Sequence, residues 1–154
     1  MPRHFESSGA LAVTLVLLSG CGGSSSSDQT AKFKASITPV VNQLRDISQG
    51  IGTAIQQAPS QTDAQIAATF HNLASRWQNQ LSQLQTLKPP SNLASTFNTL
   101  SGAASRVEVD LTAIVAAGET HSGSAAKQAS ATLVNDILSA KSASTTITDR
   151  LGIK

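Results

Sequence analysis

Apolar residues recur at spacings of three and four along most of this chain, and polar residues fill the positions between them. Because an α-helix has about 3.6 residues per turn, that spacing puts the apolar side chains on one helical face. No segment shows the strict alternation of apolar and polar residues that is typical of a half-buried strand. The pattern predicts four amphipathic helices, whose apolar positions are Phe33, Ile37, Val40, Val41, Leu44, Ile47, Ile51 and Ile55; Ile66, Phe70, Leu73, Trp77, Leu81, Leu84 and Leu87; Leu93, Phe97, Leu100, Ala104, Val107, Leu111 and Ile114; and Ala126, Ala129, Leu133, Ile137, Ala140, Ser144, Ile147 and Leu151.

The residues between the first three runs carry signals that end and start helices. Pro59 ends the first helix, because the residue before a proline disfavours the helical conformation. Thr62 and Gln65 have the spacing of a capping box, which opens the second helix. The pair of prolines at 89–90 stops the second helix, and Ser91 is expected to cap the third.

Three further positions affect the helix boundaries. Gly118 is expected just past the end of the third helix, and Ser122 or Ser124 is expected to cap the fourth. Pro39 lies inside the first helix, where it removes a backbone hydrogen bond. We expect a continuous but bent helix there; the alternative is a fresh helix start capped by Thr38.

The connections between the four helices are short, so successive helices should be antiparallel neighbours. We therefore predict an all-α fold for residues 28–154, an antiparallel up-down-up-down four-helix bundle. The alternative is a pair of helical hairpins that closes into a bundle only by dimerising. In the bundle, Phe33 and Phe97 should share a layer near one end, with Leu84 across from them, and Trp77 should lie at mid-length.

The first residues of the chain have the pattern of an export signal. Arg3 precedes a nearly unbroken apolar run from Ala10 to Leu18. That run is about half of the roughly 20 residues that a helix needs to cross a bilayer. A short apolar run between a cationic start and small residues is typical of a secretory signal peptide. We assign residues 1–20 to this peptide and expect it to be removed.

The sequence Leu18-Ser19-Gly20-Cys21 resembles the lipobox of bacterial lipoproteins, and Cys21 is the single cysteine of the chain. The resemblance implies cleavage after Gly20, diacylglycerol on the Cys21 sulfur and an acyl group on the new N-terminus. Two or three acyl chains hold a protein stably on a membrane, whereas one does not. Residues 21–27 then form the lipidated cysteine and a flexible Gly/Ser tether. The expected location is the extracytoplasmic face of the cell membrane, and the helical part is loosely similar to small all-helical lipoproteins of actinobacteria.

The composition argues against several classes of protein. The chain is 40% hydrophobic and 13% charged, which is too apolar and too weakly charged for a disordered protein. A formal net charge of +2 is not the basic excess that nucleic-acid binding requires. Cys21 can form no disulfide within one chain and has no neighbouring base to activate it as a nucleophile.

We find no catalytic or metal-binding pattern in the sequence, and we expect neither an enzyme nor a cofactor or metal site. His71 has no ligand-type residue at the i±3 or i±4 spacing that metal sites on helices use. Glu108 and Asp110 are two apart and do not face each other on a helix. The metal-capable residues expected at the end of the bundle farther from the membrane are Asp63, His71, Glu119 and His121.

Three functional hypotheses follow. The first is a non-catalytic helical binding or structural module of the cell envelope, anchored through Cys21, with an envelope protein as its partner. The alternative is a carrier or sensor of a small apolar ligand. Its basis is a set of small residues on the buried face of the fourth helix, Ala126, Ala129, Ala140 and Ser144, which either let the helices approach closely or leave a cavity. A cavity beside Trp77 would admit an apolar ligand. The third is an enzyme or metalloprotein that uses the end of the bundle with His71 and His121, and it has the weakest support.

Overall fold

A computed structural model describes residues 26–153 of the chain. The predicted signal peptide, the lipobox with Cys21 and most of the predicted tether lie outside the described residues. Four long α-helices make up nearly all of the described part, and a short 3₁₀ helix lies in each of the first two connections. In chain order the elements are α1 (Ser26–Gln57), η1 (Ala58–Ser60), α2 (Asp63–Thr86), η2 (Ser91–Leu93), α3 (Ala94–Glu119) and α4 (Gly123–Leu151).

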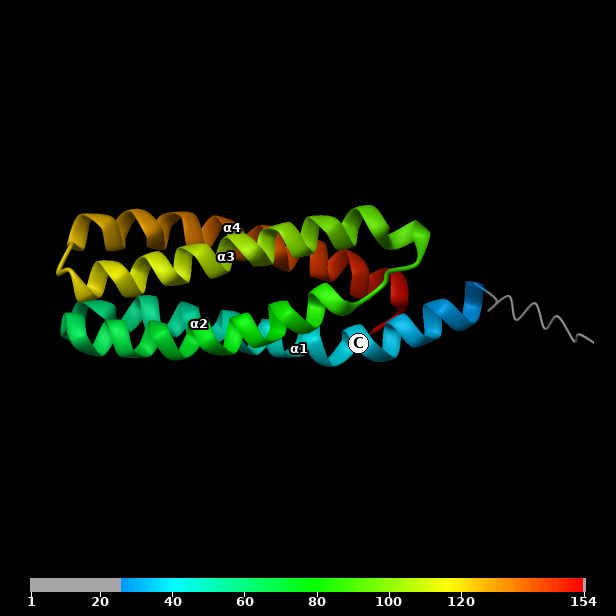
Figure 1. Ribbon diagram of the computed structural model, residues 1–154, viewed down its shortest axis with the longest axis horizontal. Helices are drawn as coiled ribbons and strands as arrows, with labels where there is room; N and C mark the ends of the chain where they lie inside the picture. The colour runs from blue at the N-terminus through cyan, green and yellow to red at the C-terminus, as the bar shows by residue number, and fades with distance from the viewer. Residues whose placement is uncertain (1–25, 154) are drawn as a thin grey trace, which may run out of the picture.

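These helices form the antiparallel four-helix bundle that the sequence predicts (Figure 1). Each helix packs on its neighbours along the chain, and α4 returns to α1 to close the bundle within one chain. The start of α1, the α2–α3 connection and the end of α4 lie at one end, and the other two connections lie at the opposite end. Within residues 26–153, none of the helices combines the length and apolar character that a membrane crossing requires.

The core of the bundle consists of the predicted apolar stripes. All the predicted positions of the first helix except Ile55 are buried, and so are all those of the third. Phe33 and Phe97 meet edge to face, with ring centroids 5.7 Å apart and planes at 72°, an arrangement that aromatic pairs favour. This contact confirms that the two rings share one layer. The fourth helix matches less fully, because Ala126, Ile137 and Ser144 are only partly buried.

Several helix boundaries follow the predicted signals. The Gln65 amide donates to the Thr62 hydroxyl at 3.3 Å, and the Thr62 amide donates to Gln65 Oε1 at 2.9 Å, which confirms the capping box. α1 runs through Pro39 as one helix, so the fresh start at Thr38 is not used. The helix already includes Ser26 and Ser27, two residues that we expected to belong to the tether.

Ser91 does not cap α3, contrary to the prediction. It begins the 3₁₀ turn η2, in which the Leu93 amide donates to the Pro90 carbonyl at 2.9 Å. The helix proper begins only at Ala94, after this turn. Ser122 does occupy the N-cap position of α4, but its hydroxyl makes no capping bond within the described chain.

Gly118 lies inside α3 and not beyond its end, which corrects a second boundary. A Cβ atom at this position would lie 3.0 Å from Ala67 Cβ and 3.3 Å from the Asp63 carbonyl oxygen, so glycine allows α3 to approach α2 closely. The left-handed residue that ends α3 is His121, with φ of 52°. The Ser122 amide then donates to the Ala117 carbonyl at 2.8 Å, as in a Schellman motif.

Candidate binding cleft between α1 and α4

A cleft of about 330 Å³ opens between α1 and α4 at mid-length. These two helices share the least extensive of the four interfaces between neighbours in the bundle, which leaves room between them. The volume is at the lower end of the roughly 300–1,000 Å³ that is usual for small-molecule sites. The cleft is lined by Val41, Leu44, Arg45, Ser48, Gln49, Trp77, Leu100, Ile137, Leu138, Ala140, Lys141, Ser144 and Thr145.

Trp77 reaches the floor of this cleft from α2. The residue is only 1% exposed, and its indole Nε1 donates a hydrogen bond of 2.8 Å to the Ala104 carbonyl of α3. This bond satisfies the one polar atom of the side chain and fixes the ring. Ala140 and Ser144 lie on the α4 wall, where larger side chains would fill the space. The space expected beside Trp77 is therefore present, as a cleft that is open on one side.

The mouth of the cleft carries two cations. Arg45 comes from α1 and Lys141 from α4, and both side chains are exposed. Neither forms a hydrogen bond or ion pair with another described residue. Leu138, which is 57% exposed, adds an apolar side chain to the rim. None of the described residues that line the cleft is acidic. The site thus combines an apolar floor with a positively charged mouth.

The far end of the bundle brings together only two of the four metal-capable residues predicted there. His121 Nδ1 lies 2.8 Å from Asp63 Oδ2, and both side chains are more than half exposed. His71 lies on the exposed surface of α2, eight residues beyond Asp63. No group of three or more histidine, cysteine, aspartate or glutamate residues in the described part of the chain could hold a metal ion.

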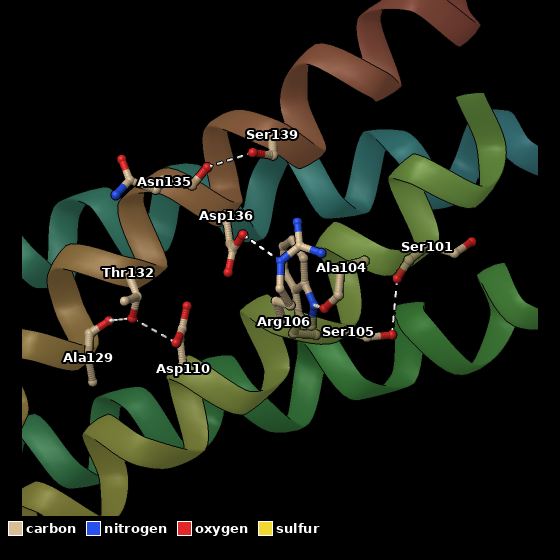
Figure 2. A network of polar contacts seen from close by, with 11 residues as sticks. Ser101, Ala104, Ser105, Arg106, Asp110, Ala129, Thr132, Asn135, Asp136 and Ser139 are labelled. Carbon is tan, nitrogen blue, oxygen red and sulfur yellow. Dashed lines mark hydrogen bonds and ion pairs between the residues drawn. The ribbon is translucent and has the colours of Figure 1, made fainter. Parts of the chain in front are cut away.

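A seam of polar contacts joins α3 to α4 (Figure 2). Arg106 Nε donates to Asp136 Oδ1 at 2.7 Å. One turn farther along α3, Asp110 Oδ1 accepts a hydrogen bond of 2.8 Å from the Thr132 hydroxyl. Figure 2 shows both pairs pointing toward each other across the interface. The seam holds the two helices in one register.

Asp110 is the electrostatically unusual member of this seam. Burial raises the pKa of its carboxyl, the hydrogen bond from Thr132 opposes that rise, and the nearby Asp136 carboxylate adds to it. The second carboxyl oxygen, Oδ2, is buried and has no hydrogen-bond partner among residues 26–153. An uncompensated buried oxygen of this kind makes the ionised form of Asp110 costly.

Sequence reasoning missed this seam because it treated Asp110 only as a partner for Glu108. The usable signal lies in two matched spacings. Arg106 and Asp110 are four apart on α3, while Thr132 and Asp136 are four apart on α4. When two helices pack antiparallel, moving four residues forward along one helix corresponds to moving four residues backward along the other. The two pairs therefore specify the alignment of the α3–α4 hairpin.

Comparison with known proteins found no relative: no protein-family model, no curated protein and no solved structure matches this chain.

Proposed function

We propose that this protein is a lipid-anchored lipoprotein on the extracytoplasmic face of the cell membrane, whose helical bundle is a non-catalytic binding module. The observation that carries the proposal is the position of the lipobox relative to the bundle. Cys21 lies five residues before Ser26, where the described helix begins. A chain of that length spans at most roughly 18 Å, so an anchor on Cys21 would hold the bundle against the membrane surface.

The end of the bundle that such an anchor would place near the membrane is tied together by cationic side chains. Lys34 Nζ donates to the Gly152 carbonyl at 3.1 Å, which joins α1 to the end of α4. Arg150 Nη1 donates to the Asn92 carbonyl at 3.2 Å, which joins α4 to η2. Cations at this end suit the negative surface potential of anionic lipids. The cleft lies at mid-length, away from this end, and would stay accessible.

The anchor is tested by substitution of Cys21→Ser in the native host. We expect the wild-type protein to begin at Cys21, to carry extra mass from acyl chains and to partition into detergent. The variant should lose both the added mass and the detergent partitioning. Intact-mass spectrometry that finds an unmodified thiol, or a leader still attached to the wild-type protein, contradicts the proposal.

The cleft favours a second candidate function, a carrier or sensor of a small apolar ligand. Its floor is apolar and buried, and Trp77, the single tryptophan of the chain, lies on it. A ligand in the cleft would therefore change the tryptophan emission directly. We expect a saturable change on titration with a ten-carbon alkyl probe at micromolar concentration. Emission that does not change with any alkyl probe contradicts this function.

A further inference from the structure

We propose that the cleft between α1 and α4 takes a single-chain amphiphile with an acidic headgroup, of which a fatty acid is the simplest example. This inference rests on the ligand-binding function proposed above and adds the chemical class of the ligand. In this arrangement the alkyl chain lies on the floor against Trp77, and the headgroup lies at the mouth between Arg45 and Lys141.

The register of the two cleft walls places these cations opposite each other. The α1 wall consists of residues within 41–49, and the α4 wall of residues within 137–145. The two helices are antiparallel, so the middle of one segment faces the middle of the other. Arg45 and Lys141 are those middle residues. One carboxylate or phosphate at the mouth would therefore accept charge-assisted hydrogen bonds from both walls at once.

The charges around the cleft favour an anion over a cation or a neutral ligand. Asp46 follows Arg45 on α1 but does not line the cleft. Asp136 precedes Lys141 on α4, but it faces α3, where Arg106 binds it. Among the described residues, the acidic ones nearest in sequence to the two cations therefore do not neutralise the positive charge at the mouth. An anion there would be attracted, and a quaternary ammonium group would be repelled.

The size and shape of the cleft limit the ligand to one chain. About 330 Å³ is near the minimum for a small-molecule site, so a lipid with two full acyl chains does not fit inside it. Leu138 extends the apolar surface at the rim, where part of a longer chain would rest. The site is therefore suited to a monomeric amphiphile and not to the surface of a bilayer.

The test compares three probes that share a ten-carbon chain: decanoate, 1-decanol and decyltrimethylammonium, each below its micelle-forming concentration. The protein is the mature chain from residue 21, carrying Cys21→Ser so that no acyl group of its own competes for the cleft. Binding is followed by the Trp77 emission. We expect decanoate to bind roughly tenfold more tightly than 1-decanol, decyltrimethylammonium to bind least, and added salt to reduce the preference.

The decisive variant is Arg45→Gln with Lys141→Gln, and its matched control is Arg76→Gln with Lys127→Gln. Both pairs remove two exposed cations from helices and replace them with a residue of similar helix propensity, and circular dichroism checks that each variant is folded. The cleft variant should bind decanoate no better than 1-decanol while still binding 1-decanol, and the control should keep the preference.

Each other outcome overturns the inference in a distinct way. Equal binding of decanoate and 1-decanol by the wild-type protein overturns the acidic headgroup and leaves the apolar ligand function standing. An equal loss of preference in the control variant shows that net charge, and not the cleft, attracts the anion. No binding of any probe overturns the ligand function and the inference together.

Discussion

The indole of Trp77 on α2 donates a hydrogen bond of 2.8 Å to the main-chain carbonyl of Ala104 on α3. That carbonyl belongs to a helix, so it can accept the indole bond in addition to its helical partner. The bond lets a large side chain with one polar atom lie almost fully buried. It also fixes which side of the ring faces the cleft, and thus links the packing of α2 on α3 to the floor of the site.

Trp77→Phe should lower the free energy of unfolding by about 1–3 kcal/mol, because it removes one buried hydrogen bond and part of the ring volume. The loss is limited because the Ala104 carbonyl stays within its helix and is not orphaned. Urea unfolding followed by circular dichroism measures the change. A decrease below about 0.5 kcal/mol would show that the indole bond contributes little.

Gly118→Ala should destabilise the bundle although alanine is the better helix former. The added Cβ would meet Ala67 Cβ at 3.0 Å and the Asp63 carbonyl at 3.3 Å, so α3 and α2 must move apart. We expect a loss of about 1–2 kcal/mol. The measurement is the urea midpoint at constant m-value.

Gly52→Ala is the matched control for this prediction. Gly52 also lies inside a helix, but a Cβ there meets nothing within 4 Å. The substitution should therefore stabilise the protein by about 0.5–1 kcal/mol, the usual gain in helix propensity. If both alanine variants were stabilising, the close approach at Gly118 would have no energetic consequence.

The contrast between these two glycines shows how far the sequence predicts this fold. The apolar stripes determine which face of each helix is buried, and the capping box at Thr62 is a purely local signal, so both were predictable. The role of Gly118 depends on the approach of Ala67 from another helix, which no local pattern reveals. A glycine at this position suggested the end of the third helix, whereas the contact with α2 explains why it lies inside α3.

The cleft was partly predictable in the same sense. Small residues on the buried face of the fourth helix, Ala140 and Ser144 among them, indicated either a close approach of the helices or spare volume beside Trp77. Helical periodicity, however, does not specify how closely two helices pack, so it could not show that α1 and α4 share the least contact. Helical periodicity also gave no reason to pair Arg45 with Lys141, because their placement at the mouth of the same cleft depends on the register between α1 and α4.

Asp110→Asn should make stability less dependent on pH in the acid range. Burial raises the pKa of Asp110 in the folded protein, whereas in the unfolded chain the pKa stays near its ordinary value of 3.8. The folded state then binds the proton more readily, so this residue stabilises the fold at low pH and that contribution is lost as pH rises through the folded-state pKa. Asparagine keeps an oxygen for the Thr132 hydroxyl and carries no charge. The variant should therefore gain stability relative to wild type as pH rises.

Urea unfolding at several values between about pH 3 and pH 7 measures this difference. Asp46→Asn, on the exposed surface of α1, is the control for removing one negative charge from the protein. A difference between Asp110→Asn and wild type that does not change with pH, or that falls as pH rises, would mean that Asp110 carries no burial penalty in the folded protein.

Ser144→Leu should fill the cleft from its α4 wall. Ser144 is partly buried and lines the cleft beside Ala140, so the three added carbons would occupy the space above Trp77. We expect the protein to remain folded, with an unfolding free energy equal to or about 1 kcal/mol above that of wild type, because apolar area is buried without removal of a hydrogen bond to another helix. Binding of decanoate and binding of 1-decanol, each followed by the Trp77 emission, should both be lost.

Ser142→Leu is the matched control, because it adds the same side chain at an exposed position of the same helix that does not line the cleft. It should leave probe binding unchanged. Binding that survived in the folded Ser144→Leu variant would place the alkyl chain outside this cleft.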